Sequence, residues 1–334
     1  EEIELAKMEV LKTIDEINRY LGLIGKMEDL IVSLVDNKDI IHDDINTIID
    51  SNDFLKGLNY KLINKGFTNT IYQVGDYIVR ICTDLSNETR FKNEIDFYLN
   101  NGNNNFPKLF HYDLSKSVIP YYYEVIERIP GKSLYEVWYK LDINERKDII
   151  LKIIDILRSI HSIVVSEYDF KEFIKSEISN LLKTCDLSDS LFFDLLSMCD
   201  VFFEKNRFGI IHNDIHFDNF IYNNGDLKLI DFERYMTGSI DYDFRRLSRY
   251  NETPWLWASI ESDMTTVESD YMDMMDIFLE NYHELSSIPC IRQRLEVYNI
   301  IELLYQYRHN KSNEMLESIR ERINKLKEFS VKLK

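Results

Sequence analysis

The chain has 334 residues; 45% are hydrophobic, 10 are glycine and 5 are proline. This composition excludes a disordered or fibrous protein, and the length suggests a globular protein with two domains or lobes. The 58 acidic residues outnumber the 40 basic ones and give a net charge of −18. Such a surface repels nucleic acid and anionic membranes and attracts cationic ligands at long range, although acidity also serves solubility alone.

The cysteines lie far apart in the sequence and form no C-x-x-C pair, so we expect neither a zinc site nor a disulfide framework. Reduced cysteines are typical of a cytoplasmic protein. No basic segment with an apolar core opens the sequence, and no apolar run approaches the roughly 18 residues of a membrane-spanning helix. We therefore expect a soluble, cytoplasmic protein without a nucleic-acid or membrane partner.

Residues 1–55 carry apolar side chains at helical spacing. Val10, Ile14 and Ile17 belong to the first such patch, and the last patch contains Ile41, Ile45, Ile48 and Ile49. We predict an N-terminal helical extension that packs as a cap on the following domain. A dimerising or partner-binding arm is the alternative.

Residues 56–130 change to the period of β-strands, with turns between them. We predict strands at residues 60–63, 70–74, 77–81 and 121–127, and a helix at residues 87–100. The polar loop between the first two strands contains Gly66, Thr68 and Asn69. Because glycine has no Cβ, such a loop can bring backbone N–H groups close to phosphates.

Arg80 lies near the end of an apolar strand, where a charged side chain is unusual unless it reaches water or a partner. The following helix carries Glu94. A helical carboxylate facing a cation on a strand would orient that cation toward a nucleotide phosphate, as the Lys–Glu pair does in kinases.

The strand at residues 121–127 ends at Glu127, and the segment Ile129-Pro130-Gly131 breaks the pattern. A Pro-Gly break between a β-rich and an α-rich half is typical of a hinge. Beyond it, we predict a turn at Thr237–Ser239 and helices at residues 149–161, 171–205, 264–284, 291–308 and 311–330. The last of these helices is rich in charge and is expected to lie exposed on the surface.

Residues 210–231 are the most informative segment. Two short apolar runs bracket a polar loop with His212, Asp214 and Asn219, and an Asn-Asn-Gly-Asp turn follows, which is typical of a hairpin. The return strand ends at Asp231. The sequence therefore predicts two carboxylates and one amide at the mouth of a small sheet.

Phosphoryl transfer from ATP requires Mg²⁺, a carboxylate that accepts the proton of the attacking hydroxyl, and a cation at the phosphates. Asp214, Asn219 and Asp231 offer oxygen ligands, which suit a hard ion such as Mg²⁺. The segment is therefore a candidate magnesium and phosphate site.

The spacing His212-x-Asp214-x-x-x-x-Asn219, with Asp231 downstream, resembles the signature of the aminoglycoside phosphotransferase and choline kinase superfamily of protein-kinase-like small-molecule kinases. Upstream and downstream motifs follow in the same order as in that superfamily and cover roughly residues 60–250. These motifs are the phosphate loop at residues 64–69, the strand cation Arg80, the helix acid Glu94, the hinge exit at residues 129–134 and the Gly-x-x-x-x-Asp motif at residues 238–243.

The resemblance implies an α+β, bilobal protein-kinase-like fold: an N-terminal helical extension at residues 1–55, a small β-rich nucleotide-binding N-lobe at 56–130 and a larger helical C-lobe at 131–334. The C-lobe would carry the catalytic loop and the substrate site. It also implies an ATP- and Mg²⁺-dependent kinase that phosphorylates a hydroxyl of a small molecule, with no prediction of the oligomeric state.

The resemblance further implies a role for each site residue. Asp214 would be the catalytic base, Asn219 and Asp231 would hold Mg²⁺, and His212 would brace the loop. The residues implied in cofactor binding are Gly66, Thr68, Asn69, Arg80, Glu94, Glu127 and Ile129.

Departures from the family pattern leave the acceptor open. Arg80 replaces the usual lysine and Asn213 replaces a glycine, as in choline kinases, whereas residues 234–243 are closer to the aminoglycoside enzymes. The net charge favours a cationic acceptor, such as an aminoglycoside or an amino-alcohol like choline, and an antibiotic-resistance role would follow from the former. Further substrate-side candidates are Trp255, Trp257 and Tyr250 as a cage for a quaternary ammonium, His216, Asp241, Asp243, Tyr305 and Tyr307.

Two other functions remain open from the sequence. A protein kinase usually has a lysine two residues after the catalytic aspartate, where this chain has His216. A pseudokinase that binds nucleotide and acts through the N-terminal helices would not need the retained Asp214 and Asp231.

Overall fold

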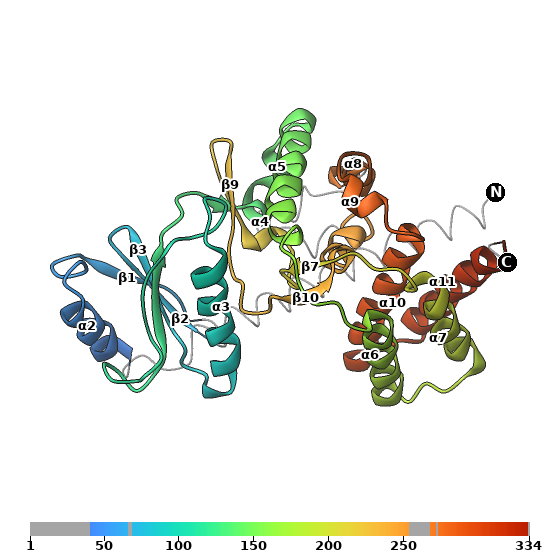
Figure 1. Cartoon of the computed structure of the whole chain (residues 1–334), viewed down its shortest axis with the longest axis horizontal. Helices are drawn as coiled ribbons and strands as arrows, with labels where there is room; N and C mark the ends of the chain where they lie inside the picture. Colours follow the sequence, from blue (N-terminus) through green and yellow to red (C-terminus); the bar gives the residue numbers. More distant parts are fainter. Residues whose placement is uncertain (1–40, 66–68, 254–267, 272, 333–334) are drawn as a thin grey trace, which may run out of the picture. The chain divides into compact units, whose positions relative to one another are not determined.

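Figure 1 shows the computed structural model, which describes residues 41–65, 69–253, 268–271 and 273–332. Within these ranges the chain forms two compact units, residues 41–140 with 217–234 and residues 141–216 with 235–253 and 268–332. We call them the first and the second unit. The helices predicted within residues 1–40 lie outside the described residues, and the domain boundaries at residues 55 and 130 stay a prediction.

An antiparallel five-stranded sheet with the order β1-β2-β3-β5-β4 is the centre of the first unit. Its strands are β1 (Tyr60–Lys65), β2 (Thr70–Val74), β3 (Tyr77–Ile81), β4 (Leu109–Asp113) and β5 (Tyr123–Glu127). The sequence predicted all of them except β4. That edge strand exposes Phe110 and Tyr112 and alternates them with polar His111 and Asp113, so it lacks the buried apolar run that marks the other strands.

The two faces of this sheet differ because successive side chains of a strand alternate. One face packs against α2 (Ile41–Ser51), whose Ile45, Ile48 and Ile49 share a hydrophobic core with the sheet residues Tyr72, Val74, Val79, Ile81, Tyr123 and Val125. Figure 1 shows α2 and α3 (Glu88–Asn101) on opposite sides of the sheet. The face away from α2 carries Arg80 and Glu124, which are paired across β3 and β5.

A small sheet completes the first unit. β6 (Lys132–Ser133) pairs with β8 (Phe220–Asn223), which forms a hairpin with β9 (Asp226–Leu229), and α4 (Leu134–Val137) follows β6 directly. The turn residues Asn224 and Gly225 have φ of 49° and 96°. Positive φ at both central residues is the geometry of a tight hairpin turn, which confirms the hairpin predicted here.

The second unit is mainly helical. Its helices are α5 (Ile143–His161), α6 (Phe170–Cys185), α7 (Ser190–Phe202), α8 (Met274–Asn281), α9 (His283–Ser286), α10 (Ile291–His309) and α11 (Asn313–Lys332). Residues 171–205, predicted to be helical, form the two helices α6 and α7, because Asp186 ends α6 in the left-handed region with φ of 59°. None of the described helices combines the length and apolar character needed to cross a membrane.

The turn predicted at Thr237–Ser239 is wrong. These residues belong to β10 (Met236–Ser239), which pairs with β7 (Phe208–Ile211) and places Gly238 opposite Gly209. A Cβ on Gly238 would lie 2.5 Å from Cδ1 of Ile211. The glycine therefore permits close packing within a strand pair, a use that the sequence pattern does not distinguish from a turn.

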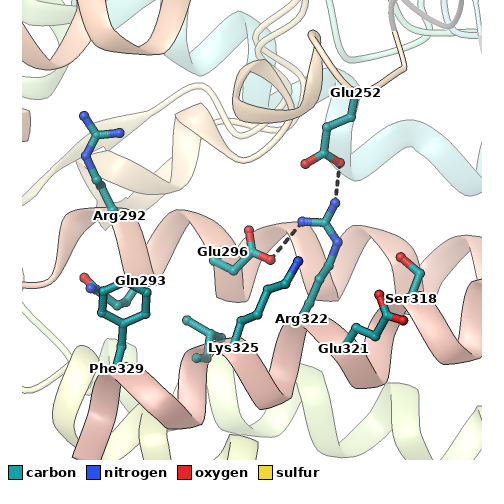
Figure 2. Close-up of a pocket in the computed structure, with 10 residues that line it drawn as sticks. Glu252, Arg292, Gln293, Glu296, Ser318, Glu321, Arg322, Lys325 and Phe329 are labelled. Carbon is teal, nitrogen blue, oxygen red and sulfur yellow. Dashed lines mark hydrogen bonds and ion pairs between the residues drawn. The ribbon is translucent and has the colours of Figure 1, made fainter. Parts of the chain in front are cut away.

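The last helix, α11, is not simply exposed, because Ile319, Ile323 and Leu326 are buried. Its polar face is also tied to its surroundings: Arg322 donates to Glu252 at 2.7 Å and to Glu296 of α10 at 2.8 Å, as Figure 2 shows. The helix is therefore amphipathic: its many charged residues lie beside a buried apolar stripe, which a judgement from charge content alone misses.

Candidate functional site

Arg80 is the centre of a buried charge cluster in the first unit. Its Nη1 donates to Glu94 of α3 and, at 3.1 Å, to Glu124 of β5, while its Nη2 lies 3.5 Å from Oδ1 of Asp231. Arg80 is 8% exposed, and Glu94 and Glu124 are fully buried. The Arg80–Glu94 pair predicted from the sequence is therefore present.

The pKa values in this cluster follow from burial. Burial disfavours the charged guanidinium, but the carboxylates of Glu94, Glu124 and Asp231 outweigh it and raise the pKa of Arg80. Burial likewise raises the pKa of Glu94, with Arg80 opposing. The pKa of Glu124 lies well above its ordinary value, because burial and the neighbouring charge of Glu94 both disfavour ionisation.

A cavity of about 410 Å³ opens beside this cluster in the first unit, within the roughly 300–1,000 Å³ typical of small-molecule sites. Arg80, Glu94, Glu127 and Ile129, all predicted to bind nucleotide, line it together with Asp231. Aliphatic side chains form much of the remaining wall, namely those of Ile63, Ile71, Ile78, Ile126, Ile221 and Ile230. The cavity thus offers an apolar wall for a planar base and a cation for phosphates.

The other predicted nucleotide contacts differ in their placement. Asn69 is buried just before β2 but does not line the cavity, and Gly66 and Thr68 lie outside the described residues. The side chain of Glu127 accepts from Lys228 at 3.0 and 3.1 Å. The backbone N–H of Glu127 donates to the carbonyl of Lys108 at 2.8 Å.

Asn219 and Asp231 lie at the open end of the β8–β9 hairpin. Asn219 ends a short 3₁₀ turn, and the backbone N–H of Ile230 donates to the carbonyl of Asn219 at 2.9 Å, so Asp231 follows directly beside it. Asp231 has φ of 69°, a left-handed conformation that aspartate tolerates better than most residues.

The position of Asp231 is fixed further by α3. The backbone N–H of Phe232 donates to Oε1 of Glu94 at 3.3 Å, and the ring of Phe232 stacks on Phe97 with centroids 3.6 Å apart. Glu94 therefore holds both Arg80 and the residue after Asp231.

Asp214 lies in the second unit, in the loop after β7. Asp243 holds this loop: its carboxylate accepts the backbone N–H groups of His212 at 2.9 Å and Asn213 at 2.7 Å, and it contacts Nε2 of His161 at 2.9 Å. His212 is fully buried.

The side chain of Asp214 contacts two basic groups. Nη1 of Arg246 pairs with its Oδ1, and Nε2 of His216 lies 3.9 Å from its Oδ2. Its neighbour Asn213 has φ of 64° and accepts from Nη1 of Arg245 at 2.6 Å. The left-handed backbone suits glycine best, and asparagine is among the few other residues that adopt it readily.

Several substrate-side candidates are corrected by burial. Asp241 is fully buried against Arg294, with Nε 2.7 Å from its Oδ2, and Asp243 holds the loop described above. Tyr250 is fully buried against Tyr271, so it forms no open cage; Trp255 and Trp257 lie outside the described residues. Tyr307 is also buried, and the hydroxyl of Tyr305 donates to Glu177 at 2.9 Å.

The structure adds Glu124, Arg246 and the loop-holding role of Asp243 to the predicted site. Glu124 could have been suspected, because an acid inside the apolar run of β5 needs a buried partner. No comparable signal marks Arg246. A second cavity of about 560 Å³ between α10 and α11 (Figure 2) contains none of the predicted site residues.

Residues 59–265 match the sequence model of the family described as phosphotransferase enzyme family. No curated protein matches the chain. Among solved structures, a streptomycin–ATP ternary complex of APH(2″)-IIa shares 16% identity at a TM-score of 0.57 and covers 86% of this chain and 97% of its own. ADP-bound aminoglycoside phosphotransferase APH(2″)-Ib shares 16% identity at 0.55, covering 86% and 98%.

A GDP complex of aminoglycoside 2′-phosphotransferase-IIIa shares 13% identity at a TM-score of 0.58, with 88% of this chain and 100% of the other covered. At such identities the likeness concerns the fold. It confirms the predicted α+β, kinase-like fold, with an antiparallel sheet in the N-terminal part and a helical C-terminal region.

Proposed function

The chain belongs to the phosphotransferase enzyme family and is a kinase-type phosphotransferase for small molecules; we propose that it transfers the γ-phosphate of ATP, with Mg²⁺ bound, to a hydroxyl group. The observation that carries the proposal is the position of Arg80. One nitrogen contacts Glu94 and Glu124, and the other lies 3.5 Å from Asp231. The predicted phosphate cation thus lies beside the predicted metal carboxylate, at the wall of one cavity.

The residues present fit a magnesium ion. Asn219 and Asp231 carry an amide and a carboxylate, and their backbones lie close together because the N–H of Ile230 donates to the carbonyl of Asn219. Mg²⁺ in kinases is commonly held by one or two such groups plus phosphates and water. Bound Mg²⁺ would neutralise charge on the phosphates.

Asp214 is proposed as the base that orients the acceptor hydroxyl and accepts its proton. The backbone N–H groups of His212 and Asn213 donate hydrogen bonds to Asp243, and these bonds fix the loop on which Asp214 lies. This restraint supports the role, because a general base must be held within hydrogen-bonding reach of the hydroxyl.

The nucleotide is proposed to be ATP, bound with its base against the aliphatic wall of the cavity and its phosphates toward Arg80. The similar structures include complexes with ATP, ADP and GDP. A direct comparison of ATP with GTP in a binding assay would separate the two purines.

The charge of the acceptor is a separate question. The net charge of −18 favours a cationic acceptor such as an aminoglycoside or an amino-alcohol, and the similar structures include streptomycin and gentamicin complexes of APH(2″)-IIa. The arginine that pairs with Asp214, Arg246, favours an acceptor group of the opposite sign at that place.

The experiment combines nucleotide binding with turnover. Mg-ATP should raise the melting temperature of the purified chain, because a ligand that binds only the folded state stabilises it by mass action. A panel of hydroxylated amines, sugars and hydroxy acids should contain a compound that becomes phosphorylated, and Asp214→Ala should abolish that transfer while nucleotide binding persists. Absence of both the melting shift and any turnover would refute the proposal.

A further inference from the structure

Two adjacent arginines follow Asp243 and contact different partners. Arg245 pairs through Nε with Glu302 at 3.0 Å and donates through Nη1 to Asn213. Arg246 instead pairs through Nη1 with the carboxylate of Asp214. Arg246 is therefore the cation in direct contact with the proposed base.

The arginines in this part of the second unit differ in the acid that balances their charge. Glu302 balances Arg245, and Glu252 lies 3.7 Å from Nε of Arg249. For Arg246, the acid that the described residues supply is Asp214 itself. The Arg246 side chain is 25% exposed, so it is accessible to a ligand while remaining partly desolvated.

The proposed transfer removes this balance. The acceptor hydroxyl gives its proton to Asp214, its oxygen forms a bond to the γ-phosphorus, and the bond from that phosphorus to the leaving oxygen of ADP breaks. Asp214 becomes neutral in this step, and Arg246 loses its counter-ion. A partly buried cation without a counter-ion is unfavourable, so an anionic group on the acceptor would restore the balance.

Resting on the proposed function, we propose that Arg246 binds an oxyanion, a carboxylate or a phosphate, that the acceptor carries close to the hydroxyl that becomes phosphorylated. Once Asp214 has taken the proton, an ammonium group at the same place would meet the like charge of Arg246 at short range. The net charge of −18 does not outweigh this local effect, because salt screens exposed charges beyond about 8 Å at physiological ionic strength.

Three compounds with the same three-carbon skeleton but different charges test the inference. They are D-glycerate, which is anionic, glycerol, which is neutral, and aminopropanediol, which is cationic. Glycerol phosphate adds the phosphate arm. Transfer of radiolabelled γ-phosphate should favour an anionic compound over glycerol by about tenfold in kcat/KM, with the amine poorest. Preference for glycerate identifies a carboxylate as the recognised group, and preference for glycerol phosphate identifies a phosphate.

Variants connect the preference to Arg246. Arg246→Gln should remove the difference between the anionic compound and glycerol, and Arg246→Lys should restore part of it. The matched control is Arg292→Gln, because Arg292 is 68% exposed and pairs with Asp276; it should leave the preference unchanged. Equal use of the three compounds, preference for the amine, or an unchanged preference in Arg246→Gln overturns the inference.

Melting temperatures with a non-hydrolysable ATP analogue provide a readout that needs no turnover. The anionic compounds should raise the melting temperature of the nucleotide complex more than glycerol does, and Arg246→Gln should remove that difference. If the nucleotide raises the melting temperature but the compounds show no order by charge, this inference fails and the proposed function stands. If the nucleotide itself has no effect and nothing is phosphorylated, the proposed function fails and takes the inference with it.

Discussion

The Nη2 atom of Arg80 lies 3.5 Å from Oδ1 of Asp231, although one belongs to a strand of the larger sheet and the other follows a separate hairpin. The contact brings the residue predicted to bind phosphate beside the residue predicted to bind the metal. Because the other nitrogen of Arg80 is held by Glu94 and Glu124, the contact depends on three acids around one guanidinium. The first two predictions concern this cluster.

Replacing Arg80 by methionine should destabilise the protein strongly. Glu94 and Glu124 are fully buried. Removing the guanidinium takes away the cation that compensates Glu94 and the hydrogen-bond donor of both carboxyl groups, at a cost of roughly 3–5 kcal/mol. Urea denaturation followed by circular dichroism measures the change.

Two controls sharpen this test. Arg80→Lys should lose less stability, because it keeps a charge, but should bind nucleotide more weakly, because one ammonium cannot reach Glu94, Glu124 and Asp231 as a guanidinium does. Arg90→Met, at an exposed position of the same helix as Glu94, should change stability by less than about 0.5 kcal/mol. Equal effects of Arg80→Met and Arg90→Met would contradict the buried-cluster interpretation.

Glu124 should make the stability depend on pH. Burial raises its pKa well above the ordinary value of 4.5, so the folded protein retains a proton that the unfolded chain releases. Stability is therefore greatest below the unfolded pKa and falls as the pH rises from there through the folded pKa. The slope in this range is at most about 1.4 kcal/mol per pH unit for each such proton.

Glu124→Gln should flatten this slope, because an amide is neutral at every pH and fills nearly the same space. Denaturation curves between pH 5 and pH 8 (roughly the range where most proteins are most stable) compare the variant with the parent. Asp96→Asn, on the exposed face of α3, is the control and should keep the parental slope. A Glu124→Gln protein with the full parental slope would assign the dependence to another group, with Glu94 next, since its pKa is also raised by burial.

Asn213 provides a matched pair of variants in the loop of Asp214. Asn213→Gly and Asn213→Ala both lose the hydrogen bond from Arg245, but only alanine adds the steric cost of φ near 64°. Alanine should therefore be less stable than glycine by about 1–2 kcal/mol, measured by thermal denaturation. Equal stabilities would mean that the loop relaxes out of the left-handed conformation.

Asp243→Asn should reduce turnover, because Asp243 positions the loop of Asp214 although it makes no proposed contact with the substrate. The amide keeps one acceptor oxygen, so it cannot accept both the His212 and Asn213 N–H groups and also keep its contact with His161. Displacement of the loop by about 1 Å would lower kcat on the order of a hundredfold. Steady-state kinetics with a compound that the panel shows to be phosphorylated measures kcat and KM separately, and the change should appear mainly in kcat.

Asp241→Asn is the matched control for Asp243→Asn, because Asp241 is equally buried two residues away but pairs with Arg294. It should lower stability, since a buried ion pair loses one partner, with a smaller effect on kcat. A larger loss of kcat in Asp241→Asn than in Asp243→Asn would show that the loop is positioned from another side.

The sequence alone determined the elements and the local chemistry of this protein. Strand periodicity predicted four of the sheet strands, the Asn-Gly turn predicted the β8–β9 hairpin, and the order of Asp214, Asn219 and Asp231 predicted the family, whose model residues 59–265 match. These features are readable because each depends on residues close in sequence. Arg80 and Glu94 were paired correctly because the strand and the helix that carry them follow one another directly.

Only the tertiary structure decided which side chains complete these groups. Glu124 joins Arg80 because β3 and β5 are neighbours in the sheet, and Asp243 and Arg246 reach the loop of Asp214 because the segment after β10 folds back beside β7. Asp241 and Asp243, considered as substrate-side residues from the sequence, are buried in the structure. Gly238, expected in a turn, belongs to a strand that pairs closely with β7. Periodicity reports how an element buries its own face, whereas the partner of a buried charge depends on strand order and chain reversal, which no local pattern encodes.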